Sequence, residues 1–222
     1  LGAGDIWYDS AAKKVQGAKL ADGSWASGGN LNTARRALRG CGTQTAGLVC
    51  AGATSAITEE YDGSSWTESG DLGTARYAGS HSGIQTASVY AGGFDDPGAC
   101  IANSEEYNGS TWAEGNNLGT GRYFVAGLGT QTAAFATGGG PQSPRNAANI
   151  VESYDGTSWT ETTDFNTAKK RHGASGTTTA ALVFGGDSPG ATATTETYDG
   201  SSWTEVGDLN TAKMGIAGFG TN

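Results

Sequence analysis

The sequence predicts an all-β protein built from repeated units of four short antiparallel strands, on three observations. An Asp-Gly or Asn-Gly turn ending in tryptophan occurs five times, and a phrase resembling Thr-Ala-Arg follows it each time. A third phrase, a Gly/Thr turn leading into a small apolar run and a glycine pair, completes the repeat. The repeats are centred on Trp25, Trp66, Trp112, Trp159 and Trp203. They recur at intervals of about 40–50 residues, the length of one four-stranded unit.

Each unit is expected to contain strands A, B, C and D in chain order. In one repeat, strand A covers residues 77–82, a turn containing Gly83 follows, and strand B covers residues 87–91. In the repeat before it, strand C covers residues 58–61, and an Asp-Gly-Ser-Ser turn leads to strand D at Trp66. Gly tolerates positive φ and Asp bonds its own backbone, so this turn suits a hairpin.

The segment 11–20 is the one stretch with a helix-like pattern. Gly17 interrupts that pattern, and the segment falls at the position of strand C in the repeat. We therefore expect a strand there.

Small residues concentrate on strands A and B, whereas Tyr and Trp concentrate on strands C and D. This distribution is typical of blades that crowd at a central axis and spread at a rim. The chain has five C–D hairpins but only four complete A–B hairpins, leaving spare strands at residues 6–8 and 214–219. The fold prediction is therefore a five-bladed β-propeller of four-stranded antiparallel blades, closed by a composite blade from N- and C-terminal strands, which leaves no open edge. A sixth blade would require residues outside this sequence.

Composition limits the classes of partner. The 222 residues carry 13 Lys+Arg against 22 Asp+Glu, a formal charge of −9, so nucleic acid is not an expected partner. The sequence contains no run of about 18 apolar residues, so membrane insertion is not expected. The cysteines Cys41, Cys50 and Cys100 have spacings typical of neither zinc nor redox sites. We expect all three to be small residues of the core. Residues 1–222 are interpreted as a single domain.

The turn from Tyr61 to Trp66, the glycine pairs such as Gly92 and Gly93, and the Thr-Ala-Arg phrase resemble kelch repeats and galactose-oxidase-like propellers. The near-identity of the copies and the opening Gly-Asp-Ile-Trp-Tyr-Asp at residues 4–9 also resemble propellers of bacteriophage tail-fibre and virion proteins. These resemblances imply a rigid binding scaffold located in a virion or outside the cell. They specify a fold better than a function.

No catalytic constellation is found. A copper oxidase of the galactose-oxidase type would need converging histidines, but His81 and His172 occupy different repeat positions. Asp95 and Asp96 are adjacent carboxylates of the kind more typical of a solvated loop than of a calcium site. We expect no catalytic residue, metal or cofactor.

Charge recurs at fixed repeat positions. Each inner strand is expected to begin with a cation, and a glutamate precedes the repeat tyrosine on strand C. The cations are Arg35, Arg76, Arg122, Lys169 and Lys213, and the glutamates are Glu59, Glu105, Glu152 and Glu196. One interpretation pairs them as structural salt bridges; the other places the cations around a channel mouth as a rim that binds an anionic ligand or an acidic loop. The composite blade has Lys19 in place of a glutamate, so Arg35 and Lys213 are expected to be free.

The predicted function is a non-enzymatic binding or structural module that recognises a host surface glycan or docks to other virion or surface proteins. The loops at residues 94–102 and 141–149 differ most between repeats, and loops on a rigid scaffold usually carry recognition. The alternatives are a kelch-type intracellular protein-interaction module and an enzyme on a propeller scaffold.

Overall fold

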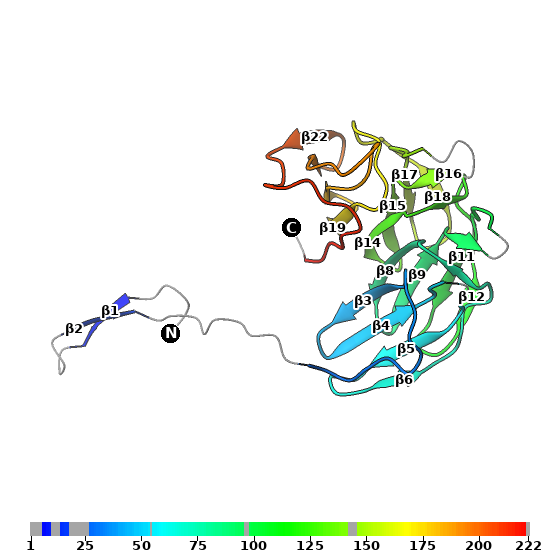
Figure 1. The fold of residues 1–222 in the computed structure, drawn as a ribbon, viewed down its shortest axis with the longest axis horizontal. Coiled ribbons are helices and arrows are strands. Elements are labelled where there is room, and N and C mark those ends of the chain that lie inside the picture. The colour runs from blue at the N-terminus through cyan, green and yellow to red at the C-terminus, as the bar shows by residue number, and fades with distance from the viewer. Residues whose placement is uncertain are drawn as a thin grey trace.

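The computed structural model describes residues 6–9, 14–17, 27–53, 55–95, 98–141 and 146–220. All regular secondary structure in these residues is β-strand, apart from turns and bends, and the larger sheets have four antiparallel strands (Figure 1). The prediction of an all-β fold from four-stranded antiparallel units is confirmed.

Four sheets correspond to four complete repeats, each ordered from an inner to an outer strand. The first contains β3 (Arg39–Thr43), β4 (Ala46–Cys50), β5 (Thr58–Tyr61) and β6 (Trp66–Glu68). The second contains β8 (Ser80–Ile84), β9 (Ala87–Ala91), β11 (Ser104–Tyr107) and β12 (Trp112–Glu114). The third contains β14 (Ala126–Thr130), β15 (Ala133–Thr137), β17 (Val151–Tyr154) and β18 (Trp159–Glu161). The fourth contains β19 (Gly173–Thr177), β20 (Ala180–Phe184), β21 (Thr195–Tyr198) and β22 (Trp203–Val206).

Two short sheets lie in the connections. They pair β7 (Arg76–Tyr77) with β10 (Phe94–Asp95), and β13 (Arg122–Tyr123) with β16 (Gly140–Pro141). Each joins the segment before an inner strand to the connection after the second strand of the same unit. These connections carry the loops predicted to differ most between repeats; residues 96–97 and 142–145 lie outside the described part.

The Asp-Gly turn forms as its residue types require. Asp62 Oδ1 accepts hydrogen bonds from the N–H groups of Ser64 and Ser65, both at 2.8 Å, and Gly63 has φ 95°. The same turn at Asp199 uses N–H groups of Ser202 and Ser201, which lower the pKa of Asp199 to about 2. Local hydrogen bonding therefore fixes the hairpin between the two outer strands.

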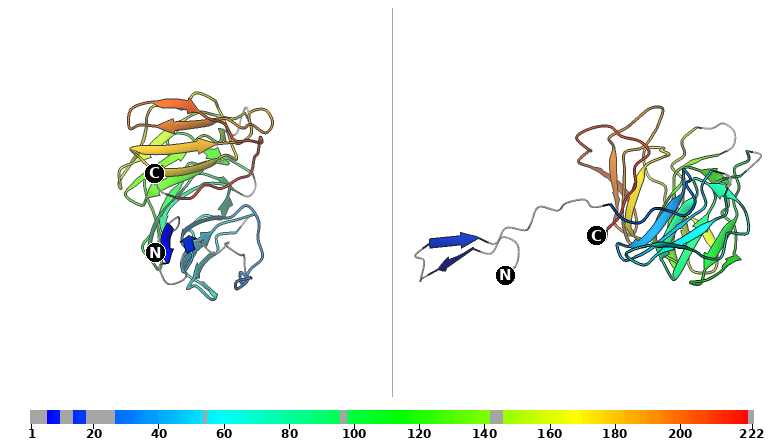
Figure 2. Two further views of the ribbon diagram at one scale, coloured as in Figure 1. Left: turned by 90° about the vertical axis from the view of Figure 1, so that its left-hand side faces the viewer. Right: turned by 60° about the horizontal axis from the view of Figure 1, so that its bottom comes forward.

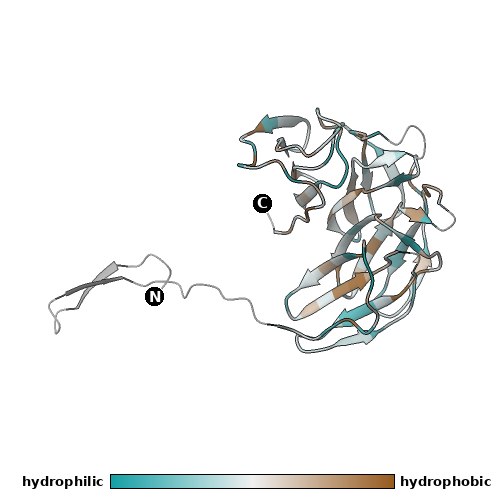
Figure 3. Ribbon diagram, viewed as in Figure 1, coloured by the Kyte–Doolittle hydropathy of each residue, from teal (hydrophilic) through white to brown (hydrophobic). Residues whose placement is uncertain are grey.

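The core lies between successive sheets. Val151 of the third sheet belongs to one buried cluster with Val183 and Trp203 of the fourth. The indole of Trp112 donates to Thr58 Oγ1 of the preceding sheet at 2.9 Å, and that of Trp159 donates to Ser104 Oγ at 3.1 Å. These two repeat tryptophans therefore pack between units, whereas Trp25 lies outside the described residues. Figure 3 shows apolar residues on β4, the second strand of its sheet, and hydrophilic residues on the outer β6.

The inner strands approach one another closely, with β3 beside β8, β8 beside β14 and β14 beside β19. A Cβ atom on Gly127 would lie 2.6 Å from the backbone nitrogen of His81, so only glycine fits there. Gly218 repeats this arrangement, because its Cβ would lie 2.2 Å from the carbonyl oxygen of Ala174. Residues 214–219 therefore follow β19 as an inner segment, although they form no strand.

A central cavity of about 400 Å³ lies among these inner segments. Five corresponding segments line it, namely residues 40–42, 81–83, 127–130, 174–177 and 218–220. The cavity is therefore surrounded by the four inner strands and the C-terminal segment.

At the N-terminus, β1 (Ile6–Asp9) pairs with β2 (Lys14–Gly17). The strand expected within residues 11–20 is thus confirmed at Lys14–Gly17. Figures 1 and 2 show this hairpin apart from the four sheets. The pairing expected between residues 6–8 and 214–219 is not present, since β1 pairs with β2 and residues 214–219 form no strand.

Candidate binding site

The repeat cations lie in buried ion pairs with the repeat glutamates. The N–O distances are 2.8 Å for Arg76–Glu105, 2.7 Å for Arg122–Glu152 and 3.3 Å for Lys169–Glu196, and Arg35 pairs with Glu59 in the same way. All eight side chains are at most 5% exposed. This is the arrangement of the structural salt bridge, the first of the two interpretations of the charge pattern.

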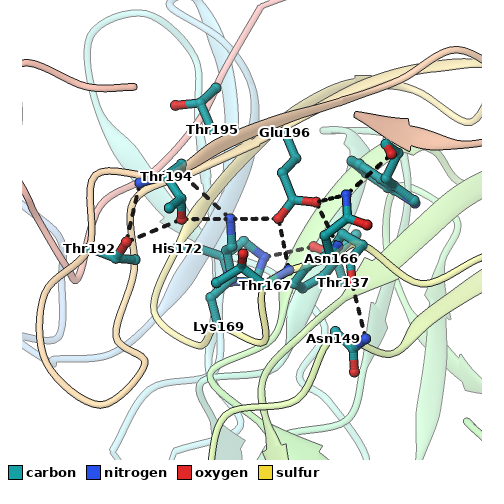
Figure 4. Close-up of polar contacts among 12 residues, drawn as sticks. Thr137, Asn149, Asn166, Thr167, Lys169, His172, Thr192, Thr194, Thr195 and Glu196 are labelled. Carbon is teal, nitrogen blue, oxygen red and sulfur yellow. Dashed lines mark hydrogen bonds and ion pairs between the residues drawn. The ribbon is translucent and has the colours of Figure 1, made fainter. Parts of the chain in front are cut away.

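Each glutamate also holds the loop that carries its cation. The second carboxylate oxygen of Glu105 accepts the N–H of Gly73 at 2.6 Å, and Glu152 accepts that of Gly119 at 2.6 Å. Figure 4 shows the fourth copy, in which Glu196 contacts Asn166, Thr167 and Lys169. We call this repeated set of contacts the carboxylate clamp.

The clamp sets the charge state of its members. Burial by itself raises the pKa of Glu59, but the Arg35 guanidinium and the N–H of Asn32 outweigh it and hold that pKa below its ordinary value. Burial lowers the pKa of Arg122, and the nearby Glu152 acts in the opposite direction. The charges therefore compensate each other inside the protein.

The expectation that Arg35 is free is wrong, because it pairs with Glu59. Arg35, like the three cations after it, pairs with the glutamate that follows it in the chain, so the residue at position 19 has no bearing on its ion pair. Lys213 is exposed and has no ion pair within the described part of the chain, while Lys19 lies outside that part. Four of the five predicted rim cations thus lie in the interior.

The cations do not begin the inner strands, contrary to expectation. Arg76 lies on β7, and Ala78, with φ 59°, separates it from β8. The same left-handed conformation recurs two residues after every repeat cation, at Ala37, Ala78, Phe124, Arg171 and Gly215. Because the left-handed region disfavours side chains, its recurrence at four non-glycine residues indicates that surrounding contacts impose it.

Hydrogen bonds between neighbouring units accompany these left-handed residues. Ala78 N–H donates to the carbonyl of Ala37 at 3.3 Å, and Arg171 N–H donates to that of Phe124 at 3.2 Å. Gly215 N–H donates to the carbonyl of Arg171 at 2.8 Å, so the C-terminal segment continues the pattern. These contacts turn each chain segment from the clamp into the inner strand.

A row of aromatic side chains lies at these turns and on the neighbouring β10. We call it the aromatic row, and it consists of Tyr77, Phe94, Tyr123 and Phe124. Adjacent ring centroids are 5.6, 5.4 and 4.8 Å apart along the row. Phe94 is 9% exposed, and the other three rings are half-buried. Partly exposed rings in a rigid row offer apolar faces to a ligand.

Two cations extend the aromatic row. Lys170 Nζ lies 6.0 Å from the centroid of the Tyr123 ring, and the Arg171 guanidinium lies 4.1 Å from that of Phe124. Arg171 is also 3.7 Å from the carboxylate of Asp187. Beside Lys170 is a pocket of about 350 Å³ that Asn146, Asp187 and residues 188–190 also line. This face combines ring faces, positive charge and polar atoms.

The buried histidines and cysteines have a different environment. His81 contacts Cys41 Sγ at 3.5 Å, Cys50 Sγ at 3.8 Å and Ser88 Oγ at 3.1 Å, and burial lowers its pKa to about 3. Burial raises the pKa of Cys41 to about 12, which keeps the thiol protonated and unreactive. Cys50 belongs to a core cluster as expected, whereas Cys41 and Cys100 are half-buried. Within the described ranges, no group of three or more His, Cys, Asp or Glu side chains is placed to hold a metal ion.

No protein-family model matches the chain, and no curated protein matches it significantly. In the described residues, no helix is long and apolar enough to cross a membrane.

Sequence reasoning missed the aromatic row and the cations beside it. A signal was available, because the residue after the repeat cation is Tyr77, Tyr123 or Lys170 in three successive copies. The sequence prediction considered only the charged position of the repeat and not the residue after it, so this surface was not predicted.

Proposed function

We propose that the chain forms a five-bladed β-propeller that acts as a non-enzymatic binding module, in a virion or outside the cell. Support for five blades comes from the five corresponding segments that surround the central cavity. The hairpin of β1 and β2 supplies two of the strands that a fifth blade needs beside residues 214–220. In this proposal it docks between the first sheet and residues 214–220, which we call the open side, and covers it.

The binding surface in this proposal is the aromatic row with Lys170 and Arg171. This is the observation that carries the function, because aromatic faces stack on sugar rings and cations bind acidic groups. The ligand class is an acidic glycan on a host surface, with other virion or surface proteins as further partners. Arg35, Arg76, Arg122 and Lys169 have no ligand role here, because their side chains are buried in carboxylate clamps.

A glycan array tests the proposal. The wild-type chain is expected to bind acidic glycans, and Tyr123→Ala and Lys170→Ala are each expected to weaken that binding. Lys213→Ala is the matched control, since it removes an exposed lysine outside the aromatic row. Wild-type binding by both Tyr123→Ala and Lys170→Ala would contradict the proposed surface.

The same assay addresses the alternatives. Cleavage of a bound glycan, detected by mass spectrometry, would indicate an enzyme. Absence of glycan binding together with capture of an acidic peptide through Lys170 would favour a protein-interaction module of the kelch type.

A further inference from the structure

A glutamine in the turn between the first two strands of a unit links that unit to the preceding one. Gln85 Nε2 donates to the carbonyls of Gly47 at 3.2 Å and Tyr61 at 2.9 Å, both in the first sheet. These two acceptor residues are directly paired on β4 and β5. One side-chain amide therefore holds the two middle strands of the neighbouring sheet together. We call this set of contacts the glutamine bridge.

The glutamine bridge recurs at the next interface. Gln131 Nε2 donates to the carbonyls of Ser88 at 3.2 Å and Tyr107 at 2.8 Å, and these acceptor residues are directly paired on β9 and β11. A side-chain amide has two hydrogens, so each bridge uses both of them. Gln85 and Gln131 are both half-buried. The bridge is thus a repeated feature of the interface between successive units.

Gln44 has the equivalent position in the first unit. It follows Gly42 by two residues, as Gln85 follows Gly83, and both glycines have positive φ. Unlike the two bridging glutamines, Gln44 is exposed, and it forms no hydrogen bond with any other described residue. The unit that would precede it in the ring is the incomplete one at the open side. The donor of a third bridge is therefore present, and its acceptors are missing.

The chain leads from the hairpin of β1 and β2 to the first sheet. The Trp66 indole N–H donates to the Gly29 carbonyl at 3.1 Å, and Asn32 Nδ2 donates to the Trp66 carbonyl at 2.9 Å. The segment from Gly29 to Asn32 thus already contacts that sheet. β2 ends at Gly17, and the roughly ten residues from there to residue 27 can span about 35 Å. A connection of that length allows the hairpin to reach the open side.

We propose that Gln44 forms a third glutamine bridge, with the carbonyls of Ile6 and Gly17 in the hairpin of β1 and β2 as its acceptors. In the two observed bridges one acceptor residue, Tyr61 or Tyr107, is the last residue of the third strand. Gly17 is the last residue of β2 and is paired with Ile6. This inference rests on the proposed closure by the hairpin and adds the residue of the first unit that recognises it.

Hydrogen exchange of the hairpin amides in the full chain tests the proposal. Gln44→Thr removes both donors and introduces the residue that the fourth unit has at this position, Thr178. Exchange of the amides of β1 and β2 should become about tenfold faster or more, because two hydrogen bonds that hold the hairpin are lost. Gln85→Thr is the matched control. It removes the same two donors from an interface between complete units and should leave hairpin exchange unchanged.

A second measurement covers a variant that fails to fold. In the NMR spectrum of the wild-type chain, the side-chain amide hydrogens of Gln44 should exchange with water as slowly as those of Gln85 and Gln131. Exchange at the rate of a free glutamine would overturn the bridge.

The outcomes separate the bridge from the closure. Hairpin amides that are protected equally in the wild type and in Gln44→Thr would overturn the bridge and leave the closure standing. Equal acceleration by Gln85→Thr would also overturn the bridge, since hairpin release would then follow from general loss of stability. Rapid exchange of the hairpin amides in the wild type would overturn both.

Discussion

The second unit and the C-terminal segment occupy equivalent inner positions but differ in what holds them. The second unit has the clamp between Arg76 and Glu105, whereas Lys213 is exposed and forms no ion pair with any described residue. Met214 is 48% exposed and Phe219 is 94% exposed. Even so, the Gly186 N–H donates to the Lys213 carbonyl at 2.7 Å, just as the Gly52 N–H donates to the carbonyl of Arg76 at 3.1 Å. A hydrogen bond from the preceding sheet therefore positions an inner segment. Burial of its side chains and pairing of its cation require the other strands of the same unit.

Removal of a clamp carboxylate should give the largest effect. Glu105→Ala leaves the buried Arg76 uncompensated, so the free energy of unfolding should fall by about 3–5 kcal/mol. Lys213→Ala should change it by less than about 0.5 kcal/mol, because an exposed side chain is removed. Urea unfolding of both variants measures the difference, and similar losses would show that the two positions are held alike.

Tryptophan substitutions compare a closed interface with the open side. Trp159 is 9% exposed between two complete units, and Trp159→Ala should cost about 3 kcal/mol. Trp66 is half-buried, and its indole N–H donates to the Gly29 carbonyl. Trp66→Ala should lower the free energy of unfolding by about 1–2 kcal/mol. Thermal and urea unfolding check the order. A larger loss at Trp66 would mean that the open side is as tightly packed as the closed interface.

Acid should weaken the complete units through their buried histidines. Burial, together with the charges of Lys169, Arg39 and Arg122, lowers the pKa of His172 to about 3 from an ordinary value of 6.5. The unfolded chain therefore binds more protons between these values, and stability should decline as the pH falls from about 6.5 toward 3. The loss should reach about 2 kcal/mol for His172 at pH 5.

His172→Val tests this pH dependence, since Val125 occupies the equivalent position in the third unit. The variant should lose part of the slope of stability against pH in urea unfolding measured from pH 7 to pH 4. An unchanged slope would show that His172 binds protons equally in the folded and unfolded chains.

Local repeat patterns predicted the strands well. The expected strand 58–61 is β5 and the expected strand 87–91 is β9, because turn residues at fixed offsets bound them. The expected strand 77–82 was displaced, since β8 covers Ser80–Ile84 after the left-handed Ala78. A non-glycine residue in that conformation has no sequence signature, because contacts with the neighbouring unit impose it.

Pairing between units was less predictable. The repeat showed that cations and glutamates recur together but not which glutamate belongs to which cation, and Arg35 was assigned wrongly for that reason. Arg39 lies outside the repeated phrases, and its place beside the central cavity depends on how the inner strands converge. Such positions require the three-dimensional arrangement.

The central claim is that the hairpin of β1 and β2 completes the unit begun by residues 214–220. Hydrogen exchange of the backbone amides of Ile216, Ala217 and Phe219 tests it most directly. The account predicts protected amides in the full chain and rapid exchange after deletion of residues 1–17, because pairing with β1 would then be lost. Rapid exchange in the full chain, or protection that survives the deletion, would contradict it.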